Sequence, residues 1–191
     1  INHSINLSQK TYLNTSVVYS TDGINDNVQA RAISSARDQG SSYQYFDGDL
    51  SKSTYRGAVT FHYKINNQHK LQAGIKYAHF SYDYFQQLRK DTVSAQVVLA
   101  DFNEQMSTLR NFINWKFQAF GKLTFIAGLH QMNEFYNKNR TLEPRFTMSW
   151  ELNPSIDLTL GYGKHSTMES VHNYFAKVAN DQGTVTEPNR N

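Results

Sequence analysis

The chain has 191 residues, 39% of them hydrophobic and 14% aromatic, with a formal net charge of +3 and a mean hydropathy of −0.63. It has no run of about 18 apolar residues, which excludes a transmembrane helix, and it has no cysteine, which excludes disulfides and thiolate metal sites. The charge is small and Lys and Arg do not cluster, so a nucleic-acid partner has little support. A transmembrane β-barrel remains compatible, because alternating polar and apolar residues average to a hydrophilic value.

Strand-like alternation begins early in the chain. Residues 11–20 place alternate apolar side chains on one face, and residues 1–7 resemble the end of a further strand. The pattern is stronger in YRGAVTFHYKI, residues 55–65, and it resumes in LQAGIKY, residues 71–77. The first part of the chain therefore predicts a strand over residues 11–20 and, after a long segment, two strands joined by a short turn.

The second half of the chain continues the alternation. LRNFINWKFQA (109–119) and KLTFIAGLHQ (122–131) form one predicted hairpin, in which Ile126 breaks the pattern. Residues 142–152 and 156–163 form another around Asn153-Pro154-Ser155. Each predicted strand has about 10–11 residues, the length that a tilted strand needs to cross a bilayer.

The connections between these strands alternate in length. We expect short turns near residues 8–10, 66–69, 120–121 and 153–155. We expect longer polar segments over residues 21–53, 85–107, 134–141 and 166–191. The first long segment can hold a hairpin extension, and residues 168–178 of the last can form a short helix with Phe175 on its apolar face.

Two readings fit strands with one apolar and one polar face: a soluble sandwich and a membrane barrel. Strand length, alternating connections and aromatic residues near strand ends favour the membrane. Alternate residues of a strand point to the same face, and we call such a set of positions one parity. On the membrane reading, the side chains of the apolar parity should face lipid: Leu123, Phe125, Leu129, Phe146, Met148 and Leu158.

The opposite parity carries charged and histidine side chains. In a barrel we expect them to face the lumen: Arg56, His62, Lys76, Arg110, Lys116, His130, Glu143, Arg145, Asp157 and His165. In a soluble sandwich the same side chains would face water.

Two chemical hypotheses compete with this structural role. Histidine is a common metal ligand, but no two histidines share adjacent ligand spacing on one strand and no carboxylate cluster joins them. Glu143 and Arg145 lie two residues apart and could do acid–base work, yet no nucleophile accompanies them. We therefore predict no catalytic, cofactor-binding or metal-binding residues, and an ion pair between Glu143 and Arg145.

The segment TLEPRFTMSWELNPSIDLTLGYGKHSTMESVHNYF, residues 141–175, resembles the barrel of TonB-dependent outer-membrane receptors of the Bacteroidetes type. In that family an LEPR strand, a short turn and a GYG.HS strand run into a loop that ends near YF. The preceding WKFQAFGKLTFIAGLHQ, residues 115–131, is similar to the strand pair before it. The resemblance is good over about residues 109–175 and diffuse over 1–108.

The resemblance implies a partial antiparallel transmembrane β-barrel, in which residues 1–191 supply about seven or eight of roughly 22 strands. It implies an outer-membrane receptor that imports a scarce or large nutrient without enzyme activity or a cofactor. Its partners would be outer-membrane lipid, the receptor's own plug domain, the TonB-ExbB-ExbD complex and, as a candidate, a surface lipoprotein. The alternatives are a non-transporting structural barrel in an envelope complex and a soluble β-sandwich that binds carbohydrate.

The family's plug, TonB box and terminal aromatic residue are absent from this sequence. We therefore expect an interior segment of a larger barrel, with the missing strands beside residues 1–20 and 156–165 and a plug that touches Arg145. Unpaired backbone edges are costly in lipid, and a narrow closed barrel would solvate the charged parity poorly.

Overall fold

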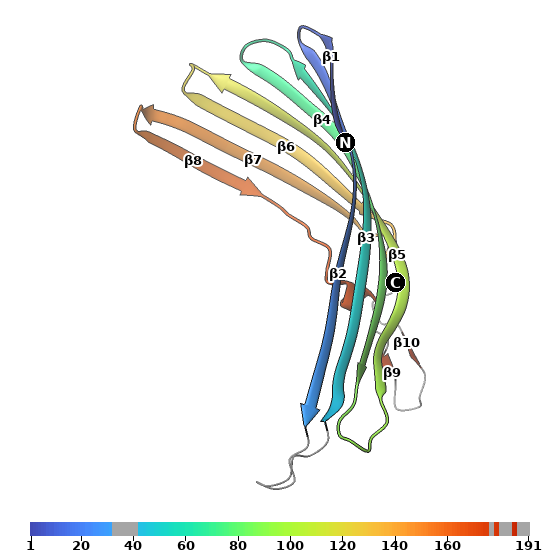
Figure 1. Cartoon of the computed structure of the whole chain (residues 1–191). Helices are drawn as coiled ribbons and strands as arrows, with labels where there is room; N and C mark the ends of the chain where they lie inside the picture. Colours follow the sequence, from blue (N-terminus) through green and yellow to red (C-terminus); the bar gives the residue numbers. More distant parts are fainter. Residues whose placement is uncertain (32–41, 176–177, 180–184, 187–191) are drawn as a thin grey trace. The chain divides into compact units, whose positions relative to one another are not determined.

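A computed structural model describes residues 1–31, 42–175, 178–179 and 185–186 (Figure 1). Eight strands form one sheet in which each strand is hydrogen-bonded to the next one along the chain. They are β1 (Asn2–Ser8), β2 (Thr11–Arg31), β3 (Ser42–Lys64), β4 (His69–Leu88), β5 (Val97–Ala119), β6 (Leu123–Glu134), β7 (Arg140–Asn153) and β8 (Ile156–Gly163). The predicted all-β antiparallel fold is confirmed at this level.

Little other regular structure accompanies the sheet in the described part of the chain. The helix α1 spans Val171–Phe175, a shorter stretch than the 168–178 expected, and the strands β9 (Val178–Ala179) and β10 (Val185–Thr186) pair with each other. Among the described residues, no helix has the length and apolar character needed to cross a membrane.

The chain divides into two compact units. Unit 1 comprises residues 1–19, 55–79 and 106–168, and unit 2 comprises residues 20–54, 80–105 and 169–191. The strands β2 to β5 contribute residues to both, whereas β1 and β6 to β8 belong to unit 1.

The predicted strand length was wrong for four strands. Instead of about 10–11 residues, β2, β3, β4 and β5 have 21, 23, 20 and 23 residues. Much of residues 21–53 and 85–107, which we assigned to long connections, is therefore strand. These segments contain Asp, Asn and Gly, which are poor strand formers, and the hydrogen bonds of the neighbouring strands override that preference. The hairpin extension of β2 and β3 is confirmed up to Arg31 and from Ser42, while residues 32–41 lie outside the described ranges.

The predicted short turns are confirmed, and they lie along one edge of unit 1. They occupy residues 9–10, 65–68, 120–122 and 154–155. Backbone hydrogen bonds link strand ends to neighbouring turns: Lys64 N–H to Lys10 O (2.7 Å), Gln118 N–H to Gln68 O (2.9 Å) and Glu151 N–H to Lys122 O (2.9 Å). The connection at residues 135–139, between β6 and β7, lies at the opposite end of these strands.

The turn between β5 and β6 requires left-handed backbone conformations. Phe120 has φ 51° and Gly121 has φ 71°. Glycine adopts such a conformation without a steric penalty, whereas a phenylalanine does not. The sequence signal that marked this turn, a glycine between two alternating runs, thus has a direct backbone cause.

The register of β5 to β8 aligns the apolar residues into rows across four strands. Phe117 pairs with Phe125, Phe125 with Met148 and Met148 with Leu160. A second row runs through Trp115, Ala127, Phe146 and Tyr162, and a third through Ala119, Leu123, Trp150 and Leu158. Facing residues on neighbouring strands share a face, so these rows form one continuous apolar surface.

This surface exposes large apolar side chains, whereas part of the polar face behind it is covered. Leu129, Trp150 and Leu158 are 45%, 44% and 50% exposed, whereas Glu143 on the polar face is 5% exposed. Of the six side chains expected to face lipid, Leu129, Phe146 and Leu158 are exposed, and Leu123, Phe125 and Met148 are half-buried by their row neighbours. They are not enclosed in a two-layer core formed by the described residues of unit 1.

Unit 2 has a conventional buried cluster. The rings of Phe80, Tyr82, Tyr84, Phe102 and Phe175 are each less than 9% exposed. Phe175, on the helix α1, lies with its ring centroid 4.9 Å from that of Phe102 and 6.4 Å from that of Tyr82. The expected apolar role of Phe175 in a short helix is therefore confirmed.

The sheet is open within the described residues. β1 and β8 are its two edges, and β2 pairs with β1 and β3. A small closed barrel would require residues 11–20 to pair with 156–165, and the strand order does not contain that pairing. The open sheet is consistent with part of a larger barrel.

Candidate functional site

The polar face of unit 1 carries the candidate site, and its centre is an ion pair on β7. Arg145 Nη2 donates to Glu143 Oε2 over 2.6 Å, and Thr141 Oγ1 donates to Glu143 Oε1 over 3.2 Å. The three residues are spaced two apart, which puts them on one face of the strand. The predicted pair between Glu143 and Arg145 is confirmed. Both carboxylate oxygens of Glu143 accept hydrogen bonds. The carboxylate is therefore better suited to holding its neighbours in place than to acting as a general base.

A chain of side-chain hydrogen bonds crosses from β6 to β4 on the same face. His130 Nε2 lies 3.0 Å from Asn114 Oδ1, and Asn114 Nδ2 donates to Gln72 Oε1 over 3.4 Å. The approach is close because Gly128 lies opposite Asn114: a Cβ there would be 2.3 Å from Asn114 Oδ1. A residue without a side chain thus makes room for the polar contact between two strands.

The aromatic ring of Phe112 also belongs to this network. Its ring stacks on His130 with centroids 5.4 Å apart, and Lys76 Nζ lies 5.3 Å above it. Phe112 could not be predicted as a site residue, because an aromatic residue among the polar positions interrupts the alternation. Gln72 and Asn114 occupy polar positions of the alternation but were not predicted as site residues.

His62 forms a separate contact on β3 and β2. Its ring stacks on Tyr12 with centroids 4.1 Å apart and an interplanar angle of 7°, and Asn14 Nδ2 lies 3.4 Å from His62 Nε2. The ring is therefore held by two neighbours from the adjacent strand.

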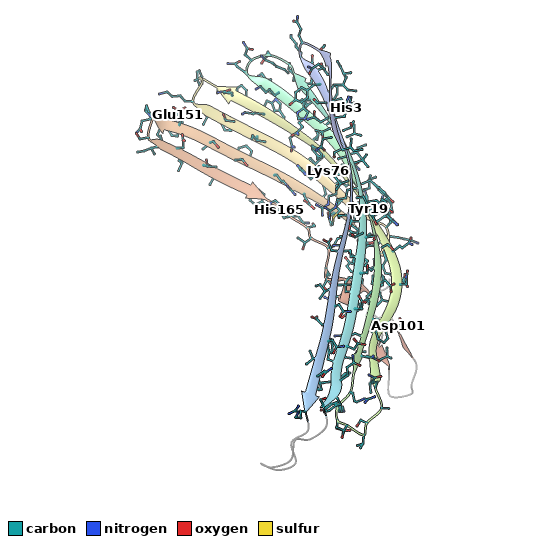
Figure 2. All side chains as sticks on the ribbon, viewed as in Figure 1. His3, Tyr19, Lys76, Asp101, Glu151 and His165 are labelled. Atoms are coloured by element: carbon teal, nitrogen blue, oxygen red, sulfur yellow. The ribbon has the colours of Figure 1, made fainter. Side chains whose placement is uncertain are left out.

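The remaining predicted residues are spread along the face. Arg56 and Arg110 are exposed, and Lys116 is half-buried. In the strand register Lys116 lies opposite Ile126 of β6, and Asp157 lies opposite Glu151 of β7. Figure 2 shows Glu151 near the turn end of β7 and His165 beyond the end of β8. A Cβ on Gly163 would lie 3.2 Å from His165 Nε2 and 3.4 Å from Arg145 Cγ, which places His165 beside Arg145. The structure thus brings together Lys76, His130, Glu143, Arg145 and His165, and it leaves Arg56, Arg110 and Asp157 apart from them.

The described residues contain no group of three His, Asp or Glu side chains arranged to hold a metal ion. What the face offers is a set of fixed hydrogen-bonding and charged groups between strands. Such a surface can bind a polar molecule or another polypeptide through directed contacts.

Models of known protein families gave no match to this chain, and curated protein sequences gave none either.

Proposed function

We propose that unit 1 is part of the wall of a transmembrane β-barrel, with its apolar face against lipid and its polar face toward the lumen. The observation that supports this most is the exposure of large apolar side chains on one face of the sheet. Trp150, Leu158 and Leu160 of the apolar rows are exposed, while Glu143 on the polar face is covered. In water, a continuous exposed apolar surface of this kind is unfavourable, whereas in lipid it is the favourable arrangement.

The distribution of aromatic residues along the apolar face supports the same proposal. Trp115 and Trp150 lie near the short turns, and Tyr19, Tyr55 and Tyr77 lie about eight or nine residues along their strands from that edge. Aliphatic side chains such as Val59, Ile75 and Ile113 occupy the positions between. Two aromatic bands around an aliphatic band are typical of membrane barrels, because amphipathic rings favour both interfaces.

Strand length within unit 1 also fits a bilayer. β2, β3 and β4 contribute residues 11–19, 55–64 and 69–79 to this unit. A tilted transmembrane strand needs roughly 9–11 residues. The longer strands therefore leave a segment of bilayer length in unit 1 and continue into unit 2.

We further propose that the barrel is an outer-membrane TonB-dependent receptor that imports a scarce or large nutrient. The support is the resemblance of residues 109–175 to that family. This segment would supply wall strands and connections at the cell surface, and a plug would contact Arg145.

The membrane proposal can be tested with the two tryptophans of the chain, Trp115 and Trp150, which both lie on the apolar face. In vesicles of phospholipid brominated on the acyl chains, we expect strong quenching of their fluorescence and weak quenching by aqueous acrylamide. The matched control replaces both with phenylalanine and introduces Thr147→Trp on the polar face, which should give the opposite result. Acrylamide quenching of Trp115 and Trp150 without lipid quenching would favour the soluble sandwich instead.

Orientation is tested by labelling whole cells that express the complete protein. A cysteine at Asn137, in the connection between β6 and β7, should react with an impermeant reagent, and a cysteine at Asn153, beside a short turn, should not. The reverse result would invert the topology. Reading the gene upstream of Ile1 separates a transporter, which needs a plug domain, from a structural barrel.

A further inference from the structure

A concave site lies on unit 1 near the short turns. It encloses about 590 Å³ and is lined by residues from β1 to β6 and the turn before β2. Four of these residues are lysines: Lys10, Lys64, Lys70 and Lys116. We call this site the lysine basin. Its volume falls in the range of roughly 300–1,000 Å³ that is usual for small-molecule sites.

The basin carries positive charge without internal compensation. Among the described residues that line it, none is Asp or Glu. Elsewhere on the polar face the arrangement differs, since Arg145 is paired with Glu143 at 2.6 Å. Four lysines lining one concavity, three of them exposed, give it a positive potential that attracts anions, because low-dielectric walls focus the field of like charges.

The rest of the lining provides neutral contacts for an organic molecule. The stacked rings of Tyr12 and His62 form a flat surface, and Ile126 adds an exposed aliphatic side chain. Gln72 and Asn114 bring amide groups that can donate to or accept from hydroxyl groups. The combination suits a molecule with a compact polar body and acidic substituents.

The parity of the lysines shows which side of the sheet the ligand approaches. Lys64 lies two residues from His62, Lys70 lies two from Gln72, and Lys116 lies two from Asn114, so all three share the polar face. Lipid headgroups would meet the ends of the apolar face instead. The basin is therefore suited to a soluble ligand.

We propose that the lysine basin binds a small organic molecule that carries two or more phosphate or carboxylate groups. The site goes beyond the proposed import function, and it does not depend on the sheet lying in a membrane. Each ammonium group contributes a charge-assisted hydrogen bond to an acidic oxygen, while the Tyr12 and His62 rings and the two amides contact the body of the ligand.

The test measures binding by calorimetry to the full chain folded in detergent micelles. The probes are fructose 1,6-bisphosphate, citrate and, as a neutral control, sucrose. We expect binding of at least one of the two acidic probes, no binding of sucrose, and a clear loss of affinity when NaCl is raised from about 50 to 300 mM. A preference between the two acidic probes identifies phosphate or carboxylate as the recognised group.

Variants locate the binding site. Replacing Lys64, Lys70 and Lys116 together with glutamine should weaken binding at least tenfold. Replacing Lys90, Lys122 and Lys138 with glutamine changes the net charge equally outside the basin and should leave the affinity unchanged. Arginine at the three basin positions should restore binding, because the charge is retained.

Three results would overturn the proposal: no binding of either acidic probe, equal losses in the two glutamine variants, or equal losses with glutamine and arginine in the basin. Lipid quenching of Trp115 and Trp150 is measured separately. Failure of probe binding with intact quenching therefore leaves the membrane proposal in place, and the reverse outcome leaves the basin in place.

Discussion

Unit 1 and unit 2 differ in the exposure of their aromatic side chains, although β4 and β5 run through both units. In unit 2, the rings on these strands are covered, and Phe175 of α1 packs against Phe102. In unit 1, Trp150, Leu158 and Leu160 are exposed, and Glu143 on the polar face is covered. Alternation with period two is common to both units. The covered rings of unit 2 occupy the alternate positions that carry polar residues such as Lys76 and Arg110 in unit 1. The two units therefore differ in which strand face carries the aromatic residues, and in unit 2 a further element, α1, packs against them.

The largest expected effect comes from removing that cover in unit 2. Phe175→Ala should destabilise the packing of unit 2 by about 3–5 kcal/mol, because a large buried ring leaves a cavity beside Phe102 and Tyr82. Hydrogen exchange of amides in residues 80–88 and 97–105 should accelerate, while those of β6 and β7 stay protected. Val93→Ala, at an almost fully exposed position of the same unit, is the control and should change nothing. Equal acceleration in both units would contradict the separation between them.

The exposed face of unit 1 should respond to charge. Phe146→Arg should cost roughly 2–4 kcal/mol in lipid vesicles, because an arginine near the bilayer midplane loses its hydration. Thr147→Arg, one residue further on the polar face, should cost little. Urea unfolding of both variants in vesicles measures the difference. If the two substitutions cost the same, the faces of β7 do not meet different solvents.

Close packing between strands gives a smaller effect that depends on the face. A Cβ on Gly74 would lie 2.6 Å from the Phe112 ring and 2.8 Å from the backbone oxygen of Val59, whereas a Cβ on Gly57 would meet nothing within 4 Å. We expect Gly74→Ala to destabilise unit 1 by about 1–3 kcal/mol, because backbone cannot yield as a flexible side chain can. Gly57→Ala should be close to neutral. Denaturant titration compares them, and a neutral Gly74→Ala would show that β3 and β4 separate easily.

The smallest expected effect lies at the edge of the polar face. Thr159 Oγ1 donates to Ser149 Oγ over 3.2 Å between β8 and β7, both exposed or half-buried. Thr159→Val keeps the shape and removes this hydrogen bond, so unfolding should become easier by about 0.5–1.5 kcal/mol. Thr159→Ser retains the hydroxyl and serves as the control. If Thr159→Val lowers the free energy of unfolding more than Gly74→Ala does, β8 contributes more to the stability of the sheet than its edge position suggests.

Much of unit 1 could be predicted from local sequence, because alternation and turn chemistry act over a few residues. The turn at Phe120 and Gly121, the rows through Phe125 and Met148 and the pair between Glu143 and Arg145 all follow from spacing of two and from glycine or proline at breaks.

The predictions that failed depend on contacts distant in sequence. The strand character of residues 21–31 comes from neighbouring strands, since Asp22, Gly23 and Asp26 disfavour it locally. Phe112 could not be recognised as a site residue, because its partners Lys76 and His130 come from two other strands. The lysine basin was missed for the same reason: its lysines are single residues in the sequence and come together only across the sheet.

The strand order, in which β1 to β8 follow one another without a crossover, has a consequence for how the sheet forms. Every described ladder of the large sheet joins strands that are consecutive in the chain. Closing each hairpin of unit 1 requires only a turn of two to four residues, or five between β6 and β7, so the entropy lost at each step is small. Short sequence separation between partners favours rapid folding. The sheet can therefore grow from any completed hairpin by adding one neighbour at a time, and each added strand becomes the template for the next.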